Sequence, residues 1–240
     1  PDSVKSIGHW AFYDTGCYND WEDSDDDVLY IGKHLISAYQ GKSTLCNIKS
    51  KTKTIADSAF FACSDLPNIT IPDTVVSIGK HAFEKCDSLK SITIPKSVTS
   101  IGDEAFYSCF DLASINVEPD NPVYRSEGGV LYNKAKTEII RFPKEKAGDS
   151  FAIPTGVIKI ADGAFEDCRN LKIVTIPDGV TSIGNHAFEN CYFATYENYK
   201  IVSEIGLEEV TIPDSVTGIG DRAFLNCSKL TGITIPDGVM

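Results

Sequence analysis

The stretch VSIGKHAFEKCDSLKSITIP, residues 76–95, decides the fold, because the chain repeats it. Much of it returns as TSIGDEAFYSCFDLASINV at 99–117 and as TSIGNHAFENC at 181–191. The cysteines in adjacent copies lie 23 residues apart wherever no extra sequence intervenes. A period of about 20–29 residues is typical of proteins that stack one short unit on the next. The block I-G-x-x-A-F, or a close variant, opens at Ile7, Ile55, Ile78, Ile101, Ile160, Ile183 and Ile219.

Each unit contains a strand pattern and a turn pattern. In L-K-S-I-T-I-P, Leu89 to Pro95, apolar and polar residues alternate as in a strand, and the proline ends it because proline has no N–H. A-F-x-x-C spaces Ala82, Phe83 and Cys86 as one face of a short helical turn would. One unit cannot enclose a core, whereas stacked units bury each other's apolar faces. The strand phrase recurs at 66–72, 89–95, 112–118, 171–177, 207–213 and 230–236, with degenerate copies at 45–49 and 151–154.

These patterns predict a right-handed repeat solenoid of leucine-rich-repeat type. A parallel β-sheet is expected on one face, with short helical or irregular turns on the other. The sequence starts and stops inside the repeated phrase, so we expect a fragment of a longer chain. We expect one domain over 1–240, with irregular insertions at about 17–44, 118–150 and 192–206.

The unit L-x-x-I-T-I-P-x-x-V-x-x-I-G-x-x-A-F-x-x-C resembles the BspA-type leucine-rich repeat and covers nearly the whole chain. DDVLYIGKHLISAY (26–39) and GGVLYNKAKTEIIRFP (128–143) also look like the VLY hairpin modules of that family. We expect the second hairpin to lie along the stack, although it could project from one edge. The resemblance implies a secreted or surface-attached bacterial protein that acts in adhesion, host-matrix protein binding or coaggregation.

Charge and hydropathy exclude several classes of partner. The formal net charge is −12 at pH 7, which argues against nucleic acid and against an anionic membrane surface. No apolar run approaches the length of a membrane helix, so this segment is not expected to be membrane-inserted. No signal peptide opens the sequence, so the extracellular or cell-surface location rests on the family resemblance.

The in-phase cysteines invite two interpretations. An even total of eight in an exported chain would suit a disulfide framework. We favour a row of buried free thiols that fill space, because ladder side chains point the same way and do not cross as a disulfide requires. Metal binding is not expected, since no C-x-x-C occurs and no histidine recurs in phase. The in-phase cysteines are Cys63, Cys86, Cys109, Cys168, Cys191 and Cys227.

Two sets of residues are candidate binding residues. The first occupies one strand phase between apolar positions and should point outward as a row, although threonine is also simply a good exposed strand residue. The second lies in the insertion at 192–206, where aromatic side chains could contact protein or glycan, or could cover the side of the solenoid. The strand row is Thr70, Thr93, Asn116, Thr175, Thr211 and Thr234, and the aromatic set is Tyr192, Phe193, Tyr196 and Tyr199.

No motif for catalysis or cofactor binding occurs: G-x-S-x-G, H-E-x-x-H, G-x-G-x-x-G and a P-loop are all absent. Asp23, Asp25 and Asp27 alternate like the start of a calcium loop, but Val28 replaces the required glycine and His34 the final glutamate. We therefore expect a non-enzymatic extracellular domain, without cofactor or metal, that binds protein of a host matrix or of another cell surface. A glycan-binding module and a passive spacer are the alternatives.

Overall fold

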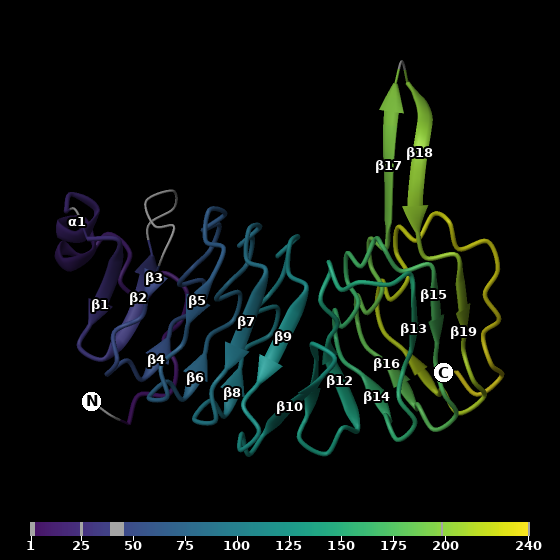
Figure 1. Ribbon diagram of the computed structural model, residues 1–240, viewed down its shortest axis with the longest axis horizontal. Helices are drawn as coiled ribbons and strands as arrows, with labels where there is room; N and C mark the ends of the chain where they lie inside the picture. The colour runs from purple at the N-terminus through teal and green to yellow at the C-terminus, as the bar shows by residue number, and fades with distance from the viewer. Residues whose placement is uncertain (1–2, 25, 39–45, 198, 240) are drawn as a thin grey trace. The chain divides into compact units, whose positions relative to one another are not determined.

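The computed structural model describes residues 3–24, 26–38, 46–197 and 199–239, in two compact units, Pro1–Tyr124 and Arg125–Met240 (Figure 1). Each unit is a stack of coils, where a coil is one turn of the solenoid. Each coil contains short strands and tight turns. In the described part of the chain the one α-helix is α1 (Gly16–Glu22), and no helix there is long and apolar enough to cross a membrane. The solenoid with parallel sheets is thus confirmed.

In unit 1 the strand phrase forms one parallel ladder and the S-I-G segment forms another. The first ladder contains β3 (Cys46–Asn47), β5 (Ile69–Thr70), β7 (Ser91–Ile94) and β9 (Ser114–Val117). The second contains β1 (Val28–Ile31), β2 (His34–Ala38), β4 (Thr54–Ile55), β6 (Ser77–Ile78) and β8 (Ser100–Ile101).

Unit 2 repeats this arrangement and adds a separate hairpin. The strand phrase forms β13 (Ser150–Ala152), β15 (Ile173–Thr175) and β19 (Glu209–Thr211). The other ladder contains β10 (Tyr124–Glu127), β11 (Val130–Asn133), β12 (Glu138–Arg141), β14 (Lys159–Ile160), β16 (Ser182–Ile183) and β20 (Gly218–Ile219). The separate hairpin consists of β17 (Tyr192–Glu197) and β18 (Lys200–Gly206).

Both VLY segments form antiparallel hairpins, β1–β2 and β11–β12, each continuous with the following parallel strand. The second hairpin therefore lies along the stack, as expected. One predicted strand is wrong: residues 231–236 form none. A strand exists only where a neighbour supplies hydrogen bonds, and Gly232 in this copy weakens strand formation.

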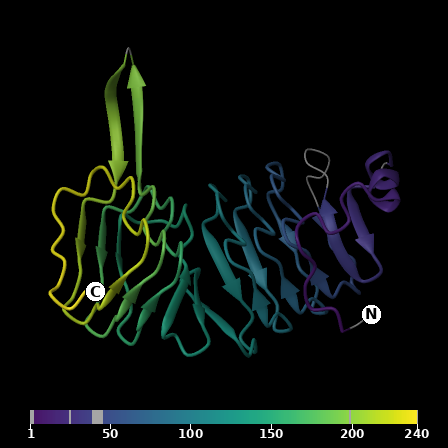
Figure 2. The ribbon, with the colours of Figure 1, turned by 180° about the vertical axis from the view of Figure 1, so that it is seen from behind.

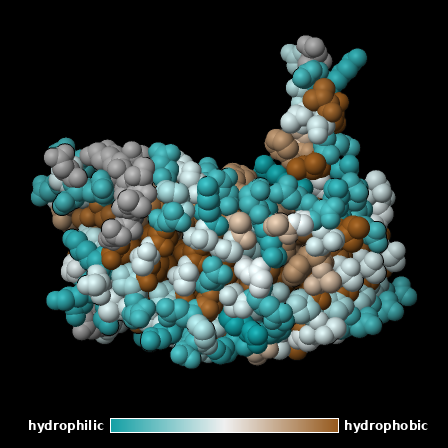
Figure 3. Space-filling view, in the orientation of Figure 1, coloured by the Kyte–Doolittle hydropathy of each residue, from teal (hydrophilic) through white to brown (hydrophobic). Residues whose placement is uncertain are grey.

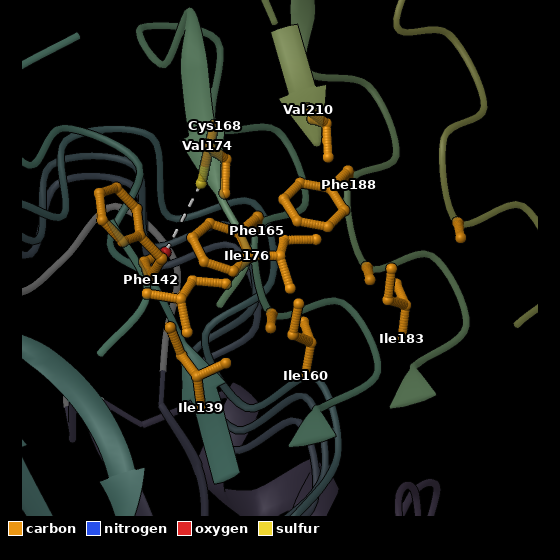
Figure 4. Packing of buried hydrophobic residues seen from close by; sticks show 14 of the residues in the cluster. Ile139, Phe142, Ile160, Phe165, Cys168, Val174, Ile176, Ile183, Phe188 and Val210 are labelled. Atoms are coloured by element: carbon orange, nitrogen blue, oxygen red, sulfur yellow. Dashed lines mark hydrogen bonds between the residues drawn. The ribbon is translucent and has the colours of Figure 1, made fainter. Parts of the chain in front are cut away.

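The core of each unit is a set of rows, one side chain per coil. The phenylalanines of A-F stack face to face, with ring centroids 5.1 Å apart for Phe60 and Phe83 and 4.8 Å apart for Phe165 and Phe188. Isoleucine and valine rows from both ladders close around them, as Figure 4 shows for unit 2. Each coil thus completes the burial of the next, which no unit could achieve alone.

The A-F-x-x-C segment is an irregular turn in every described copy, and none forms a helix. The residue before Ala and the residue before Cys take left-handed conformations, with φ of 53° at His81 and 58° at Lys85. Between them the backbone bonds to the next coil: the N–H of Phe83 donates to the carbonyl of Ala105 at 2.8 Å. The left-handed residues turn every second N–H of the segment toward the next coil. The turn therefore adds a third set of hydrogen bonds between coils, beside those of the two ladders.

The I-G glycine is required by contact and not by a special φ. A Cβ added at Gly102 would lie 2.4 Å from the backbone nitrogen of Lys80, and one at Gly79 would lie 2.5 Å from the carbonyl carbon of Ala56. Successive coils therefore approach more closely here than any side chain permits.

Candidate binding surfaces

The in-phase cysteines lie inside the coils and donate hydrogen bonds to the previous coil. The thiol of Cys109 lies 3.0 Å from the carbonyl oxygen of Phe83, and that of Cys191 lies 3.0 Å from the carbonyl oxygen of Phe165. The corresponding hydrogen bond of Cys168 is longer: its thiol lies 3.7 Å from the carbonyl oxygen of Phe142, as the dashed line in Figure 4 shows. Each thiol thus satisfies a buried carbonyl as well as filling space.

Burial favours the protonated thiol at several of these cysteines. Burial raises the pKa of Cys168 to about 12 and raises that of Cys86 further still. Because the thiolate is the nucleophile and the metal ligand, the raised pKa makes Cys86 and Cys168 poor nucleophiles, whereas the hydrogen bond with Cys191 lowers the pKa of Cys227. Cys86, Cys168, Cys191 and Cys227 are free thiols, and all are buried. No group of three metal-ligating side chains occurs among the described residues.

A cluster of charged side chains is buried at the first coil of unit 2. Lys144 pairs with Asp167 at 2.6 Å, and Arg141 approaches Glu166 at 3.8 Å while donating to the carbonyl of Gly163. Burial, followed by the charge of Arg141, lowers the pKa of Lys144. The members bind each other and the backbone, which is the arrangement of a structural ion cluster.

The strand row is exposed and divides between the two units. In unit 1 Thr93 pairs with Asn116, and the bridge from Asn68 to Ser91 places Thr70 beside Thr93. In unit 2 Thr175 pairs with Thr211. The sixth member, Thr234, is exposed but lies outside any strand, so its predicted place in the row is wrong. The row offers only short hydroxyl and amide groups, which suit an extended partner more than a small ligand.

The aromatic insertion is the β17–β18 hairpin, which stands out from the coils of unit 2 (Figures 1 and 2). Tyr196 is 62% exposed and Tyr199 is fully exposed, while Tyr192 is partly buried. The hairpin does not cover the side of the solenoid, so that alternative is wrong. Several β-branched residues, which the sequence analysis did not include among the candidate binding residues, are also exposed beside these rings. Figure 3 shows hydrophobic residues along the hairpin. The exposed large apolar residues of the hairpin are Phe193, Tyr196, Tyr199, Ile201, Val202 and Ile205.

The base of the hairpin is attached to unit 2, whereas its strand edges are open. The Tyr192 hydroxyl lies 3.2 Å from Glu204, which lies 3.7 Å from the ammonium group of Lys229. The Arg169 guanidinium lies 5.3 Å from the centre of the Phe193 ring. In the described part of the chain β17 and β18 pair only with each other, so one backbone edge of each strand has no ladder partner.

A third surface was not anticipated from the sequence. His9, Trp10, Tyr13, Tyr18 and Trp21 form a series of neighbouring rings beside a pocket of about 370 Å³. The sequence analysis placed an irregular insertion at about 17–44, and its first six residues, 17–22, belong to α1. Both tryptophans of the chain lie here, only eleven positions apart, and that clustering was the signal that could have revealed the site. Asp25 of the rejected calcium pattern lies outside the described residues.

Comparison with known proteins identifies the repeat. A family model described as BspA type leucine rich repeat region matches residues 30–148, 142–206 and 199–240, in six copies. No curated protein sequence matches the chain significantly.

Several solved structures are similar. A leucine-rich repeat protein from Eubacterium ventriosum is 28% identical, with a TM-score of 0.57, over 80% of this chain and 60% of its own. A leucine rich cell surface protein from Faecalibacterium prausnitzii is 28% identical, with a TM-score of 0.53, over 79% and 59%. The pneumococcal vaccine antigen PcpA shares the fold, at 22% identity and a TM-score of 0.70, over 99% and 61%. The chain thus spans about three fifths of these solved chains.

Proposed function

The chain belongs to the BspA-type leucine-rich repeat family, and from this premise we propose that it is a non-enzymatic, extracellular protein-binding module of a bacterial surface. Repeats of this family are typical of protein-interaction modules. The cell-surface role is supported by the similar Faecalibacterium protein, whose description is a cell surface protein. We also propose that residues 1–240 form one repeat domain, since the repeat runs through both units.

The β17–β18 hairpin is the proposed contact, and its exposure is the observation that carries the proposal. Ile201 and Val202 are 51% and 55% exposed, beside the exposed rings of Tyr196 and Tyr199. A two-stranded hairpin is at best marginally stable in water. Burying its apolar side chains against a partner would stabilise both, at about 25 cal/mol for each Å² of apolar surface covered.

The open backbone edges add a way to recognise that partner. An extended segment of another protein could pair with an edge of β17 or β18, as in β-strand addition. Main-chain hydrogen bonds would then supply affinity, and the alternating side chains would supply specificity. The threonine and asparagine row of each unit is a second surface of lower hydrophobicity, to which we assign an accessory role.

Binding to a panel of purified host-matrix proteins tests the proposal. We expect Ile201→Ser combined with Tyr196→Ser to reduce binding by at least about tenfold, since such anchors dominate interfaces. Ile158→Ser is the matched control, because Ile158 is 48% exposed on a coil of the same unit. Equal loss in both variants would contradict the role of the hairpin.

The alternatives give different results in the same design. Binding to a glycan array that depends on Tyr196 and Tyr199, without protein binding, would favour a glycan module. Protein binding that survives the hairpin changes but is lost with Thr93→Ala and Thr175→Ala would move the contact to the strand row. No binding to either class would favour a spacer.

A further inference from the structure

The pocket in the N-terminal part of unit 1 has a buried lining and an exposed rim. Trp21 of α1 is 7% exposed and packs with Ile36 and Phe12. Trp10 and Tyr13 line the same pocket but are 71% and 58% exposed. A tryptophan ring this open to water is unusual, and covering it would release apolar surface from water.

The rings at the rim present several aromatic faces close together. The centroid distance is 4.4 Å from His9 to Trp10 and 5.7 Å from Trp10 to Tyr13. It is 5.3 Å from Tyr13 to Tyr18 and 5.4 Å from Tyr18 to Trp21, at different tilts. Aromatic faces carry negative charge density, so they attract cations placed over them.

The charged groups of the pocket also favour a cation. Glu22 and Asp57 contribute carboxylates to the lining, and among the described residues that line the pocket there is no lysine or arginine. One Asp57 oxygen accepts the backbone N–H of Lys80 at 2.8 Å, and the other oxygen keeps its acceptor capacity. The Lys80 ammonium group binds Asp103 instead, at 2.9 Å. Lys80 also attracts Asp57 through space, so Glu22 is the carboxylate of the lining that is farther from compensation, and His9 is the one basic side chain among the described lining residues.

We propose that this pocket binds an arginine side chain carried by an extended basic segment of a partner protein. A planar guanidinium stacks on Trp10 or Tyr13 and donates paired hydrogen bonds to a carboxylate, which the compact ammonium group of lysine does less well. The charge disfavours acidic ligands, and a cationic guanidinium gains more from the carboxylates than a neutral sugar does, because its hydrogen bonds to them are charge-assisted. This site goes beyond the hairpin contact, because it lies in the other unit and recognises charge.

The two tryptophans make the test specific. The chain has only Trp10 and Trp21, and both line this pocket, so tryptophan emission reports this site alone. We expect the peptide acetyl-Ala-Pro-Arg-Pro-Ala-amide to change the emission saturably. Its citrulline counterpart, which is isosteric but neutral, should bind at least about tenfold more weakly. Added sodium chloride should weaken the arginine peptide, because rim charges are screened.

Variants separate recognition from folding. Trp10→Ala should abolish binding, with Trp21 as the remaining reporter, and Trp10→Phe should retain part of it. Glu22→Gln keeps a carbonyl acceptor for the hydroxyl of Tyr18 while it removes the charge, and should weaken the arginine peptide by about five- to tenfold, while Glu197→Gln, an exposed change in unit 2, should not. Circular dichroism checks that each variant is folded.

Two results would overturn the proposal. One is equal binding of the arginine and citrulline peptides. The other is saturation by a neutral oligosaccharide such as maltohexaose with no response to the arginine peptide. The hairpin variant of Ile201 and Tyr196 should bind this peptide normally, so failure of this site and failure of the hairpin contact are distinguishable.

Discussion

At the scale of single residues, the I-G glycine controls how closely the coils stack. An added Cβ at Gly102 would meet the backbone of Lys80, which cannot move aside as a flexible side chain can. We predict that Gly102→Ala lowers the free energy of unfolding by roughly 3 kcal/mol, as overpacking of a rigid contact does. Urea denaturation measures the change.

The control for this prediction is another glycine with open space around it. An added Cβ at Gly232 meets nothing within 4 Å. Gly232→Ala should therefore change the free energy of unfolding by less than about 0.5 kcal/mol. Similar losses in the two variants would show that contact between coils is not the cause.

The buried thiols predict a loss of stability at alkaline pH. The pKa of Cys168 rises from 9.0 to about 12 on burial, so the folded chain keeps a proton that the unfolded chain releases. This contribution is fully present below pH 9 and is lost as the pH rises from 9 toward 12. The expected slope is about 1.4 kcal/mol for each pH unit, from this one group.

Comparison with Cys168→Ala isolates that effect from other alkaline titrations. The variant should be less stable at neutral pH by about 1–2 kcal/mol, because it loses the thiol volume and the hydrogen bond to Phe142. Its stability should then fall less steeply than the parent's above pH 9. Parallel curves from urea unfolding at each pH would contradict the buried-thiol account.

The cysteine row shows what the sequence can predict at this scale. The shared phase of the cysteines predicted that they would recur at one place in each coil. The carbonyl acceptor of Cys86, Phe60, belongs to the preceding coil, and only the three-dimensional stacking brings the two within 3.2 Å. The left-handed φ of His81 was not predicted, because the enrichment of histidine, asparagine and aspartate in that region is too weak a signal at a single position.

At the scale of elements, the hairpin is an addition that the coil does not require. Tyr192 and Gly206 are cross-strand partners, and the N–H of Leu207 donates to the carbonyl of Cys191 at 2.9 Å. The chain therefore leaves and re-enters the coil at one point. We predict that replacing residues 193–205 by Asn-Gly changes the free energy of unfolding by less than about 1 kcal/mol, since the turn suits a two-residue hairpin loop.

Urea denaturation and the matrix-protein binding assay check this replacement together. The shortened chain should keep its unfolding transition and lose the binding assigned to the hairpin. The lost contact between Glu204 and Lys229 is an exposed ion pair, which contributes little. A large loss of stability would instead make the hairpin a structural part of unit 2.

The sequence predicts the strands of the first ladder well, and the second ladder and the A-F-x-x-C turn poorly. The strand phrase predicted β7 and β9, because the alternation of apolar and polar residues gives a clear signal over several residues in both, and a proline also ends the β7 copy. The second ladder was missed because β6 and β8 are two residues each, too short for any periodicity. The turn at Ala82–Cys86 has helical spacing, but hydrogen bonding to the next coil outweighs that local preference.

At the scale of the whole molecule, the stacked fold and the place of the insertion at 192–206 were predicted, whereas the aromatic pocket of unit 1 was not. The repeated sequence determines the core, because each coil places the same apolar side chains in its interior. The proposed hairpin contact and the aromatic pocket lie where repetition fails, so period alone cannot place them. The segments YFATYE and KIVSEIG flank Asn198-Tyr199 and alternate as a hairpin would, which is the signal that could have predicted β17 and β18.

We expect net charge and the hairpin together to control self-association of the chain. At pH 7 the charge of −12 should keep copies apart despite the open backbone edges of β17 and β18. Acid protonates carboxylates and removes this repulsion near the pI of about 4.7.

We predict that light scattering will show concentration-dependent association that grows as the pH falls toward that value. The chain with residues 193–205 replaced should associate much less at the same pH, because it keeps the charge and loses the edges. Equal association of the two chains would mean that charge loss alone, acting on other surfaces, drives the assembly.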